Sequence, residues 1–256
     1  MGLREEIAAV TVRSLADIRK SAENLRDIAW ARARLRVAVA DNIASKQPLT
    51  DEDGAILASE VFGFNAPHER WWADTRLALS SPLPRACRYE SEAFWANANG
   101  FYTRQPNRYL EAIDLSNFEK RALCKAAIVV PIHLPFGQIG AASYTATDPD
   151  RTDLSAEFEE HSDELALLSH RFIAGCVKAH RTRQWLPVDC QLTKREVECL
   201  RWASIGKTDK EISLILGRSH ATVRFHIQNA GEKLDAVNRS QTIFKASQLG
   251  YLGTAA

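Results

Sequence analysis

The side chains best suited to recognising another molecule lie just beyond Ser219, on one face of a predicted helix. Arg224, Phe225 and Gln228 share that face at helical spacing, in the N-terminal half of the helix. The guanidinium of Arg224 can donate two hydrogen bonds to guanine, the amide of Gln228 can pair with adenine, and the ring of Phe225 can lie against a thymine methyl group. The pattern therefore predicts residues that read base pairs in the major groove of double-stranded DNA.

Two further helices are predicted before this one, and they would support it. Thr193 with Glu196, and Thr208 with Glu211, each match a capping box, in which both side chains bind backbone N–H groups at the start of a helix. Three apolar stripes at helical spacing then predict one shared core. They consist of Val197, Leu200 and Ala203, of Ile212, Ile215 and Leu216, and of Val223, Ile227, Ala230 and Leu234.

The connection between the second and third helices is short. Gly217 can adopt the left-handed conformation that ends a helix, and the Ser219 hydroxyl is placed to cap the next one. A tight turn between two helices that share a core is typical of a helix-turn-helix.

Phosphate contacts are expected from hydroxyl and basic side chains around these helix ends, because such groups fix the register of a protein on DNA without reading its sequence. For each of them the alternative is an ordinary solvated side chain. From Val188 onward the chain carries a net charge of +3, against −2 for the part before it, so the basic excess accompanies the predicted reader of phosphates. The expected phosphate contacts are Lys207, Ser219, Thr222, His226 and Lys233.

From Leu192 to Leu252 the chain resembles the C-terminal DNA-binding domain of the LuxR family, whose pattern has the form L-T-x-R-E-x-E…G-K-T-x-x-E-I…S-x-x-T-V-x-x-H. The resemblance assigns base contacts to Arg224, Phe225 and Gln228, in agreement with their spacing. It also implies a transcription regulator that binds as a homodimer to a palindromic operator, with half-sites about one helical turn apart.

The length of 256 residues suggests two domains. The basic segment KAHRTRQWLPVD contains Pro187, which opposes a helix, so the predicted domains are residues 1–177 and 190–256, with residues 178–189 as the linker. Five cysteines without paired spacing indicate a reducing compartment, and no apolar segment resembles a signal peptide or a membrane span. We therefore expect a cytoplasmic protein, without cofactor or metal and with no membrane partner.

The N-terminal domain is predicted to be an antiparallel sheet flanked by helices, which makes the whole chain α+β. The segment up to about Ala33 has helical periodicity, LRVAVADN alternates like a strand, and AILASEVFGF could return as its partner. IVVPIHL and GQIGAASYTAT are interpreted as a hairpin. A long amphipathic helix follows, with Leu154, Phe158, Leu165, Leu168, Phe172 and Val177 near one side.

This order of elements is similar to the ligand-binding domain of the LuxR family, which binds acyl-homoserine lactones in many members and dimerises largely through helices next to the linker. The clearest local match is VVPIHLPFGQIGAAS. If Ser81-Pro82 aligns with the family's Asp-Pro pair, the aspartate that accepts the ligand's amide hydrogen has become Ser81, an uncharged acceptor. The resemblance assigns the ligand pocket to Phe64, His68, Trp72, Ser81 and Trp95, and dimer contacts to Leu165, Leu168 and Phe172.

Several alternatives remain open from the sequence. The aromatic residues could simply fill a core, or the alignment could slip so that Glu69 or Trp71 takes a pocket position. The regulator could act without a ligand, or it could be a phosphorylated response regulator, although the expected acidic cluster and parallel sheet pattern are missing. An enzyme is disfavoured, because Ser81, His68, Cys87 and Asp74 lie close in sequence without the motif of a nucleophile or a metal site.

Overall fold

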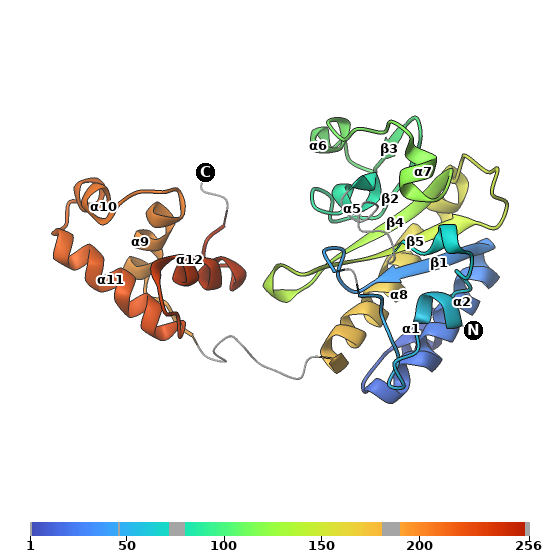
Figure 1. Cartoon of the computed structure of the whole chain (residues 1–256), viewed down its shortest axis with the longest axis horizontal. Helices are drawn as coiled ribbons and strands as arrows, with labels where there is room; N and C mark the ends of the chain where they lie inside the picture. Colours follow the sequence, from blue (N-terminus) through green and yellow to red (C-terminus); the bar gives the residue numbers. More distant parts are fainter. Residues whose placement is uncertain (1, 46, 72–79, 181–189, 254–256) are drawn as a thin grey trace. The chain divides into compact units, whose positions relative to one another are not determined.

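The computed structural model describes residues 2–45, 47–71, 80–180 and 190–253, in two compact units that divide between Arg181 and Thr182 (Figure 1). The last helix of the first unit, α8, spans Ser155–His180. Residues 178–180 of the predicted linker are therefore helical, and residues 181–189 lie outside the described residues.

The first unit is a five-stranded sheet with helices on both faces. Its strands are β1 (Leu35–Ala40), β2 (Phe94–Asn97), β3 (Gly100–Tyr102), β4 (Ala126–His133) and β5 (Ile139–Ala146). They lie in the order β1-β5-β4-β2-β3, and all these pairings are antiparallel. The predicted sheet and the β4–β5 hairpin are thus confirmed, whereas a response-regulator receiver would need a doubly wound parallel sheet.

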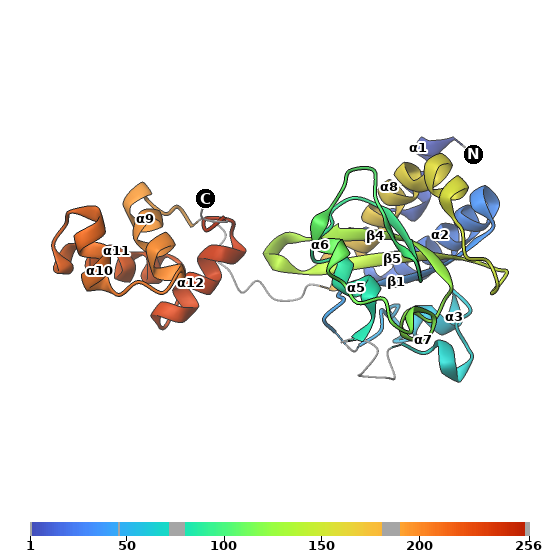
Figure 2. The same ribbon diagram turned by 90° about the horizontal axis from the view of Figure 1, so that it is seen from above.

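The helices divide between the two faces of this sheet, as Figure 2 shows. One face is covered by α1 (Leu3–Val10), α2 (Ile18–Ala33) and α8. The other side holds three short helices, α5 (Pro82–Ala86), α6 (Arg108–Glu111) and α7 (Phe118–Ala122). The short helix α3 (Leu57–Glu60) contributes Leu57 to the same core as α2 and α8. Three short 3-10 turns, η1 (Leu15–Asp17), η2 (Pro67–Glu69) and η3 (Pro135–Gly137), complete the connections.

The central strands carry large side chains on the face toward α8. Val37, Tyr144 and Ile128 are neighbours across β1, β5 and β4, and all three are buried. Ser169 donates its hydroxyl to the Leu165 carbonyl, so the Tyr144 hydroxyl, 2.6 Å away, donates to Ser169. Burial raises the pKa of Tyr144, which keeps it protonated as this donor. The bond fixes the register of α8 on the sheet.

The long helix α8 packs its apolar side into the core of its own unit. Leu165, Leu168 and Phe172 are each 0% exposed, so the prediction that they form dimer contacts is wrong. Their spacing marks the face of α8 that covers the sheet, and a core face and an interface face look alike in a sequence. Gly175 allows a close approach, because a Cβ there would lie 2.7 Å from the Val12 carbonyl oxygen.

Two assignments in the first unit differ from expectation. The segment AILASEVFGF contains α3, and Leu57 in α3 and Val61 directly after it are both buried at i,i+4 spacing, so the prediction of a strand is wrong. The strands β2 and β3 come instead from the aromatic segment around Trp95, for which no strand was predicted.

The second unit consists of α9 (Lys194–Ser204), α10 (Asp209–Leu216), α11 (His220–Lys233) and α12 (Arg239–Gln248). Both predicted capping boxes are present, at Thr193 and at Thr208. Gly217 ends α10 in the left-handed conformation, with φ of 60°, which confirms the predicted turn. The buried core comprises Cys199, Leu200, Ala203, Ile212, Val223, Ile227, Ala230, Leu234 and Ala246.

Candidate functional site

The side chains predicted to read bases all lie on the exposed face of α11. Phe225 is 59% exposed, and Arg224 and Gln228 are exposed as well. The opposite face of α11 is buried, with Val223 and Ile227 in the core that α9 and α10 share. A large aromatic ring exposed between two polar side chains is unusual on a helix that has no partner, and it suits contact with the apolar edge of a base.

Both ends of α11 are fixed by side chains. At its start, the Ser219 hydroxyl accepts a hydrogen bond from the Thr222 N–H at 3.0 Å. Near its end, the buried Lys245 of α12 donates its ammonium to the carbonyl oxygens of Leu234 and Asp235, at 3.0 and 2.6 Å. A cation at a helix C-terminus compensates the carbonyl groups that the helix leaves without N–H partners. Side chains therefore hold both ends of α11 in place.

Lys233 has a different role from the predicted phosphate contact. Its ammonium lies 2.9 Å from both carboxylate oxygens of Glu196, which is only 2% exposed. Burial alone would raise the pKa of Glu196, but the hydrogen bonds from Lys233 and Thr193 hold that pKa below its usual value. Glu196 closes the capping box of α9, so the ion pair joins the start of α9 to the end of α11.

Of the other predicted phosphate contacts, Ser219 and Thr222 lie at the start of α11, His226 lies in its middle, and Lys207 precedes α10. Ser219 is exposed and Thr222 half-buried, and their hydroxyls are 2.8 Å apart. His226 is half-buried, one residue beyond Phe225. The Lys207 ammonium is half-exposed and 3.8 Å from the Glu211 carboxylate. Phosphate contacts by these four side chains stay predictions.

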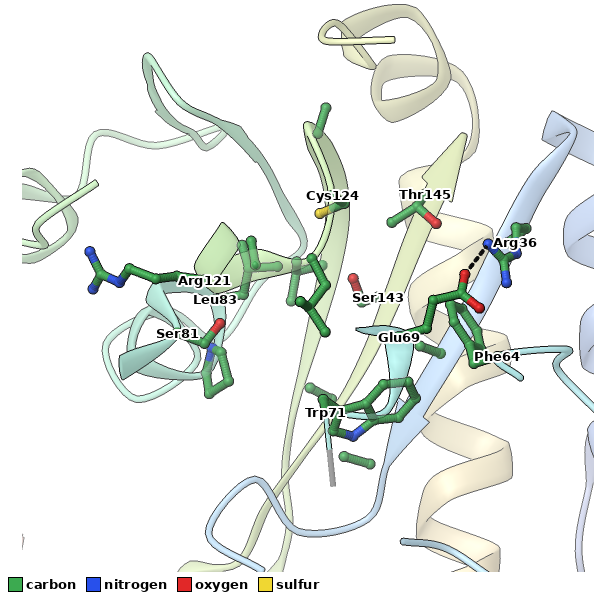
Figure 3. Close-up of a pocket in the computed structure, with 18 of the residues that line it drawn as sticks. Arg36, Phe64, Glu69, Trp71, Ser81, Leu83, Arg121, Cys124, Ser143 and Thr145 are labelled. Carbon is green, nitrogen blue, oxygen red and sulfur yellow. Dashed lines mark hydrogen bonds and ion pairs between the residues drawn. The ribbon is translucent and has the colours of Figure 1, made fainter. Parts of the chain in front are cut away.

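The first unit contains a cavity of about 610 Å³ between the sheet and the short helices (Figure 3). Its floor is the face of the sheet opposite α8, where neighbouring strands pair small residues. Ala38 lies opposite Ser143, and Ala40 lies opposite Ala141. Leu83 of α5, Val129 of β4 and Trp71 add apolar walls. Volume and lining are in the range of small-molecule sites.

The structure brings together only part of the predicted pocket. Phe64 and Ser81 line the cavity. Trp95 does not line the cavity, because β2 directs Phe94 toward the cavity side and Trp95 toward α8. The Trp95 ring stacks on the Tyr102 ring, with the ring centroids 4.0 Å apart. His68 belongs to η2, but its side chain and the whole of Trp72 lie outside the described residues.

Glu69 and Trp71, the residues that a slipped alignment would bring in, do line the cavity. The Trp71 ring meets Phe64 edge to face, with the ring centroids 5.4 Å apart. Glu69 accepts a hydrogen bond of 2.9 Å from Arg36, whose guanidinium carbon lies 4.3 Å from the centroid of the Phe64 ring. Figure 3 shows this group at one side of the cavity. Arg36 was missed because nothing local in the sequence joins it to Glu69.

The two cysteine thiols that line the cavity are poorly suited to catalysis. Cys87 and Cys124 both line it, and burial raises the pKa of each to about 12, so both stay protonated and poorly nucleophilic. Within the described ranges, no three His, Cys, Asp or Glu side chains are grouped to hold a metal ion. None of the described helices combines the length and apolar character that a bilayer crossing needs.

One family model matches part of the second unit. Residues 190–246 match the family described as bacterial regulatory proteins, luxR family. The transcriptional activator protein VanR of Vibrio anguillarum is 39% identical over 130 residues, 50% of this chain and 52% of that protein. The quorum sensing-dependent transcriptional regulator VjbR of Brucella ovis is 37% identical over 140 residues, 54% and 52% of the two chains. The crystal structure of Escherichia coli SdiA has a TM-score of 0.38 and 22% identity, and the match covers 72% of each chain.

The chain thus spans about half the length of the curated relatives that it matches. The matched residues 190–246 include both capping boxes, the left-handed Gly217 and the exposed face of α11. Residues 190–246 are thus similar to the luxR family of bacterial regulatory proteins over this whole stretch.

Proposed function

We propose that this protein is a transcription regulator that binds DNA through α11 as a homodimer and senses a small molecule in its N-terminal cavity. The observation that carries the DNA-binding proposal is the exposed triad of Arg224, Phe225 and Gln228 on a helix whose other face is core. The relatives named above are themselves described as transcriptional regulators, and one as quorum sensing-dependent.

DNA binding is tested with the full-length protein and duplexes selected from a random-sequence library. Arg224→Ala should weaken binding to the selected site and relax its preference at one base pair, by about 1 to 3 kcal/mol. Arg171→Ala removes an exposed arginine from α8 and serves as the charge-matched control. If both variants bind the selected site like the wild type, α11 is not the reading element.

The dimer proposal needs contacts other than the buried residues of α8. Leu167 is 38% exposed on the outer side of that helix and is the apolar side chain that we assign to contact with a second copy. A two-fold dimer would select a palindromic site. Sedimentation of the wild type and of Leu167→Asp tests this, and a wild type that is monomeric at micromolar concentration, with and without selected DNA, would contradict it.

The sensing proposal rests on the cavity, because a tightly filled core would leave no such space. A ligand that binds only the folded protein raises its melting temperature with ligand concentration. Coupling to DNA follows if the ligand changes the affinity for the selected duplex, since binding free energies are linked reciprocally. A regulator that needs no ligand would bind the duplex equally well with and without any compound that raises the melting temperature.

A further inference from the structure

The exposed face of α11 carries a single carboxylate, that of Glu232. Glu232 is the only acidic residue within α11, all of which the structure describes, and it lies one turn after Gln228 on the exposed side. The neighbouring Lys233 is bound to Glu196, so Glu232 has no ion-pair partner among the described residues. A negative charge without a partner is unfavourable on a helix that approaches phosphate groups. Its presence on this face therefore calls for a specific role.

The contact that suggests this role is a hydrogen bond from Gln228. Its Nε2 atom lies 3.4 Å from Oε1 of Glu232, at the i,i+4 spacing that brings side chains together on a helix. An ionised carboxylate only accepts hydrogen bonds, whereas an amide has an accepting oxygen and a donating NH2 group. Gln228 must therefore turn its NH2 group, and not its Oε1, toward Glu232. The contact selects one of the two orientations of the amide.

The selected orientation limits what Gln228 can offer to a base. With one N–H bound to Glu232, the amide retains one further N–H and its Oε1. Adenine presents the accepting N7 and the donating N6 amino group in the major groove, which match one donor and one acceptor. Guanine presents two acceptors, N7 and O6, and needs two donors. An amide that turned freely could offer both of its N–H groups to guanine, and the held amide cannot.

We infer that Glu232 is a positioning residue that makes Gln228 select adenine over guanine at one base pair of the DNA site. Glu232 acts through the Gln228 amide and touches no base itself. The inference rests on the proposed reading of DNA by α11. It is independent of the proposed sensing of a small molecule.

The test first locates the base pair that Gln228 reads. The full-length protein selects a duplex from a random-sequence library, and fluorescence anisotropy gives the affinities of the wild type and of Gln228→Ala for duplexes changed at each position. At the position where Gln228→Ala loses the preference, adenine is compared with guanine. The wild type should bind the adenine duplex at least about tenfold more tightly, as expected of a good bidentate contact.

Glu232→Gln is the informative variant. The new amide keeps the length of the side chain and can still accept, but it also donates, so Gln228 can turn either way. The adenine-to-guanine ratio should fall below about threefold, and Glu232→Ala should give the same loss. Binding to unrelated duplexes should stay equal or become tighter, because one negative charge is removed. Glu198→Gln removes the same charge from an α9 side chain that pairs with Arg195, and this control should keep the wild-type ratio.

A double variant separates positioning from a direct contact with DNA. In the Gln228→Ala background, Glu232→Gln should change the adenine-to-guanine ratio by less than about twofold, because the residue through which Glu232 acts is gone. A general structural role of Glu232 would instead weaken binding to all duplexes alike.

Several results would overturn the inference. They are a Gln228→Ala variant that changes the preference at no position, a wild type that does not prefer adenine there, a wild-type ratio in Glu232→Gln, an equal loss of affinity for all duplexes in that variant, and a full effect of Glu232→Gln without Gln228. Loss of selective binding in Arg224→Ala would still identify α11 as the reading element in each of these cases. A wild type that selects no duplex would reject the proposed DNA reading and this inference with it.

Discussion

Lys245 offers the sharpest test of how the end of α11 is held. Its ammonium is buried, with the residue 4% exposed, and donates to two carbonyl oxygens at the end of α11. Lys245→Met keeps the length of the side chain and removes the donor. Hydrogen bonds from charged groups contribute about 1.5 to 3 kcal/mol each, and a buried acceptor left alone costs about 1 to 3 kcal/mol.

Only the Leu234 bond is fully buried, so water can replace the donor at Asp235. The methionine also avoids the cost of burying an ammonium, which offsets part of the loss. We therefore expect a net loss of about 2 kcal/mol in the stability of α11. Amide hydrogen exchange in the full-length protein should then be about thirtyfold faster along α11, because each 1.4 kcal/mol is about a factor of ten.

The matched control is Lys210→Met, which changes an exposed lysine on α10. A surface change of this kind should leave stability within about 0.5 kcal/mol. Exchange along α11 that is equally fast in Lys245→Met, Lys210→Met and the wild type would refute the assignment of Lys245 as the group that holds the end of α11.

Three further outcomes follow from the packing. The folded state holds the pKa of Glu196 below its usual 4.5, so the ionised carboxylate stabilises the fold above about pH 4.5, and this contribution is lost as the pH falls through the folded-state pKa. The free energy of unfolding in urea should therefore depend less steeply on acid pH in Glu196→Gln than in the wild type. An equally steep dependence in both proteins argues against the ion pair. Gly175→Ala would place its Cβ 2.8 Å from the Val12 Cβ and should cost about 1 to 3 kcal/mol in unfolding free energy, whereas an unchanged value would mean that α8 is not so close. Phe172→Ala should cost about 3 to 5 kcal/mol, with Leu167→Ala well below it, and comparable losses would contradict the assignment of Phe172 as core.

The second unit could be predicted closely because its signals are local. Each capping box at Thr193 and Thr208 connects residues three apart, and Gly217 acts at a single position. The ion pair between Lys233 and Glu196 spans 37 positions, and no local pattern distinguishes such a lysine from one that contacts phosphate.

The first unit was harder to predict from the sequence, because the contacts that determine it are long-range. The helical face of α8 was predicted, but periodicity does not tell whether Phe172 faces its own sheet or a second copy. The position of Trp95 depends on which face of β2 turns toward α8, and a shift of one residue reverses that choice. Ser81, which the resemblance assigns to a ligand pocket, lines the cavity, whereas Arg36 and Glu69 meet only after the chain has folded.

The pleat of the sheet separates two tasks that β1 and β5 both perform. Along β1 and β5, residues that fill the core alternate with residues that shape the cavity, so a substitution at Ala38, Ala40 or Ala141 changes the space for a ligand while its two chain neighbours keep packing toward the helices. Replacement of one of these alanines by a larger residue would shorten or narrow the cavity at that position alone. The size of the cavity can therefore change by single substitutions on this face of the sheet, without replacement of the side chains that fill the core beneath α8.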